Sequence, residues 1–380
     1  MDIFSWILTL SILAGQLIKI PIGTHGGVTL LDIAVITLCL TGLVKVQFKL
    51  DKPPLFVSTA LIFILIAILS LLLTPLNLQT IQYFTSFSYT IRFSLYILLS
   101  WLISSGAFPS IRKQIPRILV FSGIGLAIVG LWQLIFLPDL MFLTKWGWDP
   151  HYFRTASTFL DPNFLGAYLV LTFSLLVHNR SVPGRQKRVL ALIIVYLALL
   201  TTFSRGAYLA FLTSFLTLSF FQKSLKLAII TILLFALLLL GFSTYQRLVA
   251  QPRGIDRSQS AEFRLGTWQQ GWQLFSQHPF LGVGFNAYKF ALKEYNLGDE
   301  QFLKSAGSST NDSSLLYVAV TTGTVGFIIY LLFLGSIFYG RNYLLTAGLI
   351  GLISQSFFAN TLFYPPLLIW IILMAANQKR

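Results

Sequence analysis

The residues that could carry chemistry gather in one polar stretch, 245–314, of an otherwise apolar sequence. This stretch contains Arg264, Trp268 and Trp272 at intervals of four, then His278-Pro279-Phe280-Leu281-Gly282-Val283-Gly284, then Ser309-Thr310-Asn311-Asp312. A guanidinium group such as that of Arg264 can bind an anion through two parallel hydrogen bonds. A carboxylate such as that of Asp312 can accept a proton from an attacking hydroxyl group. The stretch therefore holds groups that could bind an anion and move a proton.

Structural roles would also explain these residues. Asp312 precedes an apolar run and could cap a helix N-terminus. His278 stands before a proline at a helix end, which is typical of capping or packing residues. Gly282 and Gly284 fit a tight turn, or alternatively a nest of N–H groups that holds a phosphate. Both kinds of interpretation stay open at this point.

The spacing from residue 261 to 277 predicts a helix that ends at His278-Pro279. Arg264, Trp268, Trp272 and Phe275 then follow one another along one face. The tryptophans fit an interfacial anchor, with Arg264 directed at head groups. Ligand binding is the alternative for Arg264.

The composition identifies the class of protein that positions these groups. The 380 residues are 56% hydrophobic and 10% charged, whereas a soluble domain has about 25% charged residues. The mean hydropathy is +0.77. The first apolar run lacks a basic start and a small-residue cleavage site, so we expect it to be a retained helix. Cys39 is the single cysteine, and we expect no disulfide, metal or cofactor.

Apolar runs, cut at charges, prolines and turn residues, predict about twelve membrane spans. They are residues 3–18, 27–44, 54–75, 82–105, 116–137, 159–178, 189–203, 206–221, 226–243, 314–339, 342–360 and 362–377. The predicted fold is an all-α integral membrane protein with one large extracytoplasmic loop that contains short helices. Its regions are an N-terminal transmembrane region (1–243), a catalytic loop (244–313) and C-terminal transmembrane helices (314–380).

The net charge of +15 predicts the orientation. Lysine and arginine cluster after alternate spans, which is typical of cytoplasmic loops. The clusters are 45–52, 112–117, 180–188, 223–226, Arg341 and 379–380. Both termini are then cytoplasmic and the long loop is outside. The basic residues left on the outer side or within spans include Arg92, Arg154, Arg205, Arg257 and Arg264, and they suit an anionic ligand such as a lipid-linked phosphate.

Further polar groups lie at the outer end of the sixth predicted span. Asp161 and Pro162 predict a helix start there, followed by Asn163. Arg154 and Arg205 are expected at the same level, either as ligand-binding groups or in salt bridges to Asp149 or Asp161. Separately, Asp32 is a costly charge within the second span, and we expect it to pair with Arg92.

Five motifs in this order resemble the O-antigen ligase and polymerase family. They are Thr158-Phe159-Leu160-Asp161-Pro162-Asn163-Phe164-Leu165-Gly166, Phe203-Ser204-Arg205-Gly206-Ala207, the pair Arg264 and Trp268, His278-Pro279-Phe280-Leu281-Gly282-Val283-Gly284, and Gly323-Thr324-Val325-Gly326. The resemblance extends from about Asp32 to the end of the chain. It carries no information on the sugar or on the oligomeric state.

The resemblance implies a multi-pass glycosyltransferase of the C type in the bacterial inner membrane, independent of metal and nucleotide. It would move a glycan from an undecaprenyl-diphosphate donor to an acceptor on the outer face. The acceptor is the lipid A core for ligases and another glycan repeat for polymerases. The bilayer is then a partner and nucleic acid is not.

The resemblance also implies roles for residues. Arg205 and Arg264 match arginines that hold the donor diphosphate. Ligases carry a His-Asn pair before the glycines of the tenth span, and that pair falls on Asp312 and Ser313, or on Thr310 and Asn311. Since no histidine is present at either place, Asp312 would serve as the base, which favours a polymerase or a divergent transferase over a ligase. The expected catalytic residues are Asp312, Arg264 and Arg205, and the expected substrate-binding residues are Arg154, Asn163, Trp268, His278 and Asn311.

Two other functions remain as alternatives. A transporter or flippase for lipid-linked oligosaccharides would show paired broken helices at the membrane midplane and two related halves. The polar residues of this chain lie at one face instead, which favours the enzyme. The glycosyltransferase is expected to invert the configuration at the anomeric carbon. A non-catalytic partner in cell-envelope assembly would leave Arg205, Arg264 and Asp312 individually replaceable.

Overall fold

The computed structural model describes residues 1–22, 26–178, 182–255, 259–340 and 342–378, and these are largely helical. Arg180, Arg257, Arg341, Lys379 and Arg380, used in the charge analysis, lie outside the described residues. The first nine apolar helices are α1 (Ile3–Ala14), α2 (Leu30–Lys45), α3 (Leu55–Leu72), α4 (Thr80–Ser104), α5 (Pro109–Phe136), α6 (Pro162–His178), α7 (Arg185–Thr201), α8 (Arg205–Phe221) and α9 (Leu225–Tyr245). The last three are α13 (Ser314–Phe338), α14 (Tyr343–Gln355) and α15 (Pro365–Ala376).

Each predicted span coincides with one of these helices. In the part of the chain that is described, five helices are long and apolar enough to cross a membrane: Leu55–Leu72, Thr80–Ser104, Pro109–Phe136, Leu225–Arg253 and Gly307–Phe338. The others are shorter apolar helices, so the number of crossings stays a prediction. The helical fold class is confirmed.

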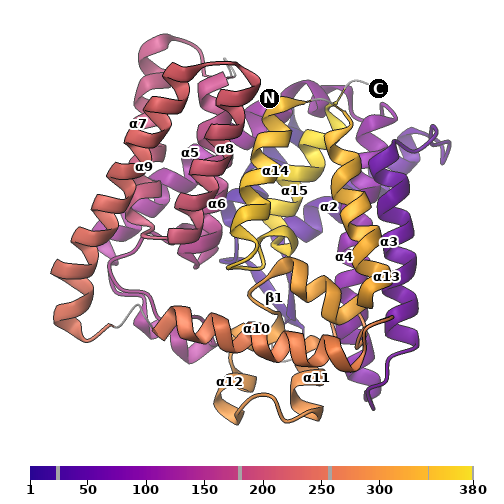
Figure 1. The fold of residues 1–380 in the computed structure, drawn as a ribbon. Coiled ribbons are helices and arrows are strands. Elements are labelled where there is room, and N and C mark those ends of the chain that lie inside the picture. Colours follow the sequence, from indigo (N-terminus) through magenta and orange to yellow (C-terminus); the bar gives the residue numbers. More distant parts are fainter. Residues whose placement is uncertain (23–25, 179–181, 256–258, 341, 379–380) are drawn as a thin grey trace.

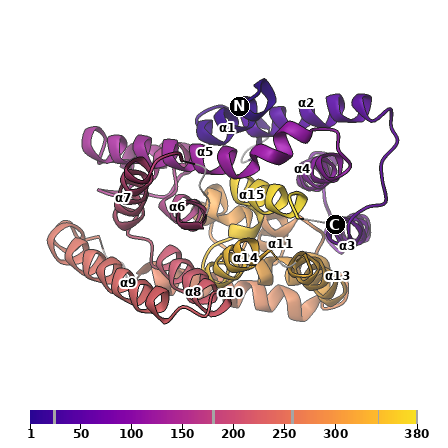
Figure 2. The same ribbon diagram turned by 90° about the horizontal axis from the view of Figure 1, so that it is seen from above.

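In its described residues, the segment between α9 and α13 contains the α-helices α10 (Gln259–Gln277), α11 (Tyr288–Glu294) and α12 (Glu300–Lys304), besides short 3-10 and π turns. The predicted helix before His278-Pro279 is therefore confirmed as α10. Figure 1 shows α10 lying across one end of the bundle, with both termini at the opposite end. Seen from above, α15 lies in the middle, between α4 and α8 (Figure 2). Every residue of α15 is buried, as is typical of a helix that is apolar on all sides.

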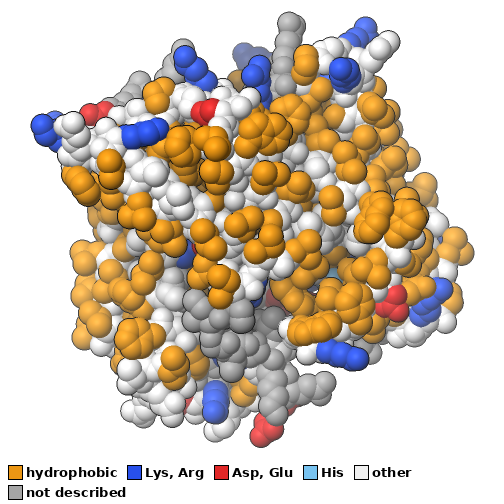
Figure 3. Space-filling model, turned by 180° about the vertical axis from the view of Figure 1, so that it is seen from behind, with side chains coloured by type: hydrophobic (Ala, Val, Ile, Leu, Met, Phe, Trp, Pro, Cys, Tyr) orange, Lys and Arg blue, Asp and Glu red, His pale blue; other side chains and the backbone are white. Residues whose placement is uncertain are grey.

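The outer surface of the bundle is apolar. Figure 3 shows hydrophobic side chains over most of one face, with lysine and arginine toward its upper and lower edges. Elsewhere on the outer surface, helix α9 exposes Leu233, Leu237 and Leu240. Such a belt between charged edges fits a lipid bilayer.

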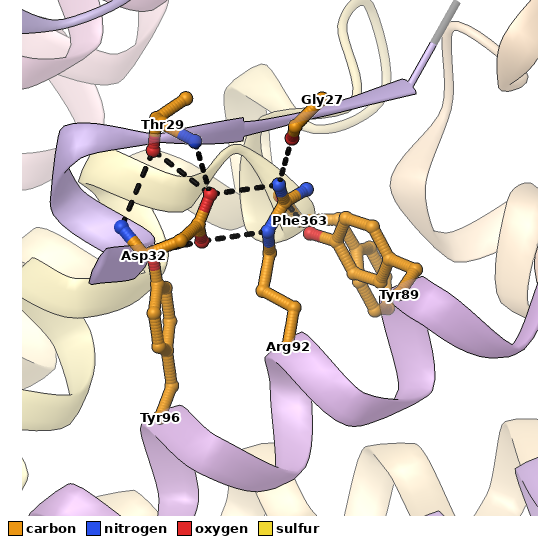
Figure 4. Close-up of polar contacts among 7 residues, drawn as sticks. All are labelled: Gly27, Thr29, Asp32, Tyr89, Arg92, Tyr96 and Phe363. Atoms are coloured by element: carbon orange, nitrogen blue, oxygen red, sulfur yellow. Dashed lines mark hydrogen bonds and ion pairs between the residues drawn. The ribbon is translucent and has the colours of Figure 1, made fainter. Parts of the chain in front are cut away.

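One feature was not predicted, a two-stranded antiparallel hairpin of β1 (Lys19–Ile22) and β2 (Gly26–Thr29). It leads into α2 through a capping box, in which Thr29 Oγ1 accepts a hydrogen bond from the Asp32 backbone N–H. The predicted pairing of Asp32 with Arg92 is confirmed, since Arg92 Nε lies 2.8 Å from Asp32 Oδ1. Figure 4 shows the Arg92 guanidinium between this carboxylate and the Gly27 carbonyl oxygen, with Tyr96 also donating to Asp32.

Helix α13 is interrupted at Gly323, where φ is 65° and ψ is −171°. A turn of residues 278–284, which we call the docking turn, fills the interruption. Its Val283 and Gly284 N–H groups donate to the carbonyl oxygens of Val320 and Thr321 at 3.0 and 3.1 Å. In return, the N–H groups of Thr324 and Val325 donate to Pro279 and Phe280 at 2.7 and 3.3 Å.

The exchange of hydrogen bonds satisfies backbone groups that a broken helix would leave unpaired in lipid. It also uses the N–H groups of residues 283 and 284, so these do not form a phosphate nest. The turn interpretation of Gly282 and Gly284, with φ of 69° and 102°, is the one that the structure supports.

The backbone geometry at the break predicts that a side chain at residue 323 destabilises the protein. A Cβ atom there would lie 2.0 Å from the Phe280 carbonyl oxygen, and the left-handed backbone alone costs a non-glycine residue about 1–3 kcal/mol. We expect Gly323→Ala to lower the melting temperature of the detergent-purified protein clearly. Gly335→Ala is the matched control, because it lies in the same helix with nothing within 4 Å of its Cβ position. Equal melting temperatures for the two variants would contradict this account.

Candidate functional site

Asp312 lies against the middle of α10. Ser313, and not Asp312, caps α13, because Ser313 Oγ accepts from the Leu316 N–H at 3.3 Å. The Asp312 carboxylate instead accepts from Thr267 Oγ1 at 3.2 Å. Since Thr267 follows Arg264 by three residues on α10, both side chains share a face of that helix. The charges of Arg264 and Asp312 are close enough to interact.

Asn311 fixes this arrangement. Its side-chain amide donates to the Thr267 carbonyl oxygen at 2.6 Å and to Tyr288 Oη at 3.0 Å. Its Oδ1 accepts from the Ser313 N–H at 2.9 Å, and the residue is fully buried. Gly271 allows the approach, since a Cβ atom there would lie 2.8 Å from Asn311 Nδ2. Asn311 therefore positions Asp312 against α10.

Arg205 and Arg264 line one cavity of about 390 Å³, which we call the arginine cavity. Its remaining lining residues are Gly206, Leu209, Leu265, Trp268 and Phe358. The Trp268 and Phe358 rings are stacked with centroids 6.1 Å apart. The cavity thus combines two cations with apolar and aromatic walls.

Arg205 is held at the first position of α8 by the turn before it. Phe203 has a positive φ of 46°, and Ser204 Oγ caps the helix by accepting from the Ala207 N–H. The same hydroxyl donates to Asn163 Oδ1 at 2.8 Å. The turn between α7 and α8 is thus tight and partly buried, and Asn163 supports it from α6. The Arg205 guanidinium lies over the Phe242 ring at 5.6 Å.

Arg154 lies behind this turn. Its side chain is 2% exposed, and its Nε donates to the Thr202 carbonyl oxygen at 2.8 Å. Its NH1 lies 3.4 Å from His151 Nδ1. The positive charge of Arg154 also acts on Asp149 and Asp161. The geometry therefore gives Arg154 a structural contact with the turn and an electrostatic one with two carboxylates.

Three carboxylates, Asp149, Asp161 and Asp312, form what we call the carboxylate cluster. Asp149 is on the exposed surface of the loop after α5, yet protein surrounds its carboxyl group on most sides. Desolvation, with the negative charges of Asp161 and Asp312, raises the pKa of Asp149 to about 6, against the opposing effect of Arg154 and Arg264.

Burial also raises the pKa of Asp161, while hydrogen bonds from the N–H groups of Asn163 and Phe164 oppose this. Those bonds, at 2.6 and 3.4 Å, confirm the predicted helix start. A place for Asp149 in the cluster was not predicted, because its neighbours in sequence carry no signal of contact with Asp312.

His278 lies apart from these groups. Its Nε2 is 2.6 Å from Tyr295 Oη, and burial lowers its pKa. The fourteen residues from Arg264 to His278 span roughly 21 Å at the helical rise per residue. Trp272, with 62% of its surface exposed, packs beside Phe275, as an interfacial anchor would.

The structure thus brings together Arg205, Arg264 and Trp268 in one cavity, with Asp312 and Asn311 beside it. Asn163 and Arg154 support the turn that carries Arg205. Among the described residues, no group of three or more His, Cys, Asp or Glu side chains is placed to hold a metal ion.

Residues 190–331 match the family model described as O-antigen ligase. No curated protein matches the chain. The matched region contains Arg205, α10 and the Asn311-Asp312 pair. The similarity to the O-antigen ligase family therefore covers the part of the chain that carries these residues.

Proposed function

We propose that the protein is a membrane glycosyltransferase that polymerises or ligates glycans in surface polysaccharide synthesis. The donor would be an undecaprenyl-diphosphate-linked glycan at the outer face of the inner membrane. One observation carries the proposal: the arginine cavity adjoins a carboxylate, Asp312, that is held in place without capping a helix.

The arginine cavity has the chemistry of a lipid diphosphate site. Two guanidinium groups can hold the two phosphates and stabilise the charge that develops as the diphosphate leaves. Leu209, Leu265 and Phe358 offer apolar surface to the polyprenyl chain. Arg264 joins the cavity to Asp312, because its charge acts on that carboxylate.

The reaction would be a single displacement. An acceptor hydroxyl attacks the anomeric carbon, and its proton passes to the Asp312 carboxylate. The bond between the anomeric carbon and the phosphate oxygen breaks, and its electron pair leaves with the diphosphate held by Arg205 and Arg264. One displacement inverts the configuration at the anomeric carbon.

The identity of the base favours polymerisation over ligation. Ligases, in the resemblance described above, carry a histidine at the position where this chain has Asp312 or Thr310. Asp312 is the member of this pair that lies beside Arg264. A hydroxyl group on a second glycan repeat is then the acceptor that we propose.

The break in α13 raises the transporter alternative, since transporters bind substrates at interrupted helices. In such sites the unwound backbone faces the substrate. Here the docking turn bonds to the backbone on both sides of Gly323. The interruption therefore supports an anchoring role and favours the enzyme.

Loss of the Arg264 guanidinium should impair transfer. With an undecaprenyl-diphosphate oligosaccharide as substrate, we expect Arg264→Ala to lower kcat/KM by about 10²- to 10³-fold, as for removal of one stabilising donor. Arg264→Lys should lose less, because it keeps the charge without the planar fork. Arg253→Ala is the control, since Arg253 lies over the Tyr152 ring and outside the cavity lining. Gel analysis of product length gives the readout, and an undiminished ladder in Arg264→Ala would refute the donor site.

Replacement of the proposed base should act on kcat. Asp312→Asn keeps the shape of the side chain and removes a negative charge beside Arg264. We therefore expect donor affinity to be kept or increased and kcat to fall by about 10²- to 10⁴-fold. Asp299→Asn is the matched control, because Asp299 caps α12 in the same segment by accepting from the Phe302 N–H. It should keep its stability, because asparagine caps a helix as well as aspartate does, and also its activity. Turnover by Asp312→Asn at the wild-type rate would exclude Asp312 as the base.

The raised pKa of Asp149 predicts a pH effect on donor binding. As the pH rises through about 6, Asp149 ionises and adds negative charge beside the donor site. We therefore expect the donor affinity of Asp149→Asn, divided by that of the wild type, to be near one at pH 5. The ratio should rise to roughly two to five at pH 7.5, the range for a partly exposed charge.

The ratio of affinities removes the effect of the ionisation of the diphosphate itself, which is the same for both proteins. Both affinities can be measured from the change in tryptophan fluorescence when the donor binds. The same ratio for Asp299→Asn should not change with pH. A constant ratio for Asp149→Asn would separate Asp149 from the donor site.

A further inference from the structure

A second cavity lies away from the arginine cavity. It has a volume of about 360 Å³ and is bounded by the β1–β2 hairpin, α2, α4 and α11. We call it the hairpin cavity. The helices that line the two cavities, α4 here and α8 there, lie on different sides of α15 (Figure 2). The hairpin cavity is therefore a separate compartment of the bundle.

The lining of the hairpin cavity changes in character along α4. Thr85 and Ser88 come first in the helix, Arg92 follows, and Leu95 lies one turn further. On α2, Asp32 is followed by Val35 and Ile36 in the same way. The end near α11 is thus polar, and the deeper part is apolar.

The deeper part opens toward the apolar surface of the bundle. Ile36 and Ile91 line it and are 38% and 48% exposed, respectively. An amphipathic molecule would fit this gradient, with its polar group near α11 and its chain along α2 and α4. A wholly polar solute would leave the apolar part unfilled.

The polar end carries an excess of positive charge. Arg92 is neutralised by Asp32 (Figure 4). Lys19 and Lys289 also line the cavity, and neither forms an ion pair with a residue in the described part of the chain. Burial lowers the pKa of Lys289 to about 8. Desolvation and the Arg92 charge lower the pKa of Lys19, against the opposing charge of Asp32. An ammonium group that loses water without gaining a counterion, as that of Lys289 does, favours a bound anion.

The hairpin cavity also reaches the carboxylate cluster. Ser309 and Thr310 line it and directly precede Asn311 and Asp312 in the chain. Trp148 lines it as well, immediately before Asp149. The arginine cavity reaches the same cluster through Arg264. Residues that adjoin the carboxylate cluster, in sequence or through the charge of Arg264, therefore line both cavities.

We propose that the hairpin cavity binds the phosphate-bearing end of a second lipid-linked glycan, the acceptor. Its chain would lie along Ile36 and Ile91, its phosphates would contact Lys19 and Lys289, and its glycan would extend past residues 309–310 to Asp312. The inference rests on the proposed function, because only a transferase with two lipid-linked substrates needs both cavities. It names the acceptor as a lipid phosphate and assigns it a site.

Counting bound lipids tests the proposal. The protein is placed in phosphatidylcholine nanodiscs with undecaprenyl diphosphate, and native mass spectrometry counts the lipids that stay bound. We expect two in the wild type and one in Lys19→Gln/Lys289→Gln, with the second binding event at least about tenfold weaker, as for loss of hydrogen bonds to charged groups. Lys293→Gln is the matched control, since Lys293 is exposed on α11 and does not line the cavity. Lys289→Arg should keep both lipids because it keeps the charge.

The same measurement separates failure of the hairpin-cavity proposal from failure of the donor-site proposal. Two lipids bound to Lys19→Gln/Lys289→Gln would overturn the inference. Displacement of the second lipid by phosphatidylglycerol at equal concentration would also overturn it, because the cavity would then bind bulk anionic lipid. Arg205→Gln/Arg264→Gln should also bind one lipid, and two lipids there would refute the proposed donor site while leaving the hairpin cavity assigned. A normal elution profile on size exclusion shows that each variant is folded.

Discussion

The reciprocal hydrogen bonding at Gly323 is the contact on which the geometry of the site depends. A membrane helix cannot be interrupted unless its backbone groups find other partners. The docking turn supplies them from both sides of the break. Because the turn directly follows α10, it fastens the end of that helix to the middle of α13. Helix α10 is thereby held across the end of the bundle, as Figure 1 shows.

The start of α13 provides the second attachment of α10. Asn311 binds the Thr267 backbone, and Asp312 binds the Thr267 hydroxyl group. With its end fixed at Gly323 and its middle fixed at Asn311, α10 can present Arg264 toward Arg205 of α8. Two arginines of like charge approach one another in one cavity only when the surrounding structure holds them there, and nearby carboxylates reduce the repulsion. The carboxylate cluster supplies that negative charge.

Much of the helical fold could be predicted from hydropathy, because lipid imposes a minimum length on apolar runs. The chemistry of single residues was equally informative where a residue type fits only one local structure. Asp32 within an apolar run requires a partner, and it has Arg92. Asp161 before Pro162 caps a helix start. The turn at Ser204 follows from the short separation of two apolar runs.

Contacts between distant segments could not be predicted in this way. Gly323 stands in an apolar run that reads as a continuous helix, and its break depends on a turn about forty residues earlier in the chain. The hairpin of Lys19–Ile22 and Gly26–Thr29 is too short for a periodic signal. Asp149 joins the cluster only through the packing of the loop after α5. Asp312 had two interpretations in sequence, and the capping role of Ser313 separates them.

An aspartate at position 312 changes the charge balance that a histidine would give. A neutral imidazole would leave the attraction of Arg205 and Arg264 for a diphosphate undiminished, whereas an ionised carboxylate beside Arg264 opposes it. In the proposed reaction, the same carboxylate would become neutral on taking the proton of the acceptor hydroxyl. The pull of Arg264 on the leaving diphosphate would then no longer be shared with Asp312. Proton transfer would therefore strengthen the stabilisation of the leaving group when its negative charge develops, which is the differential binding that lowers a barrier.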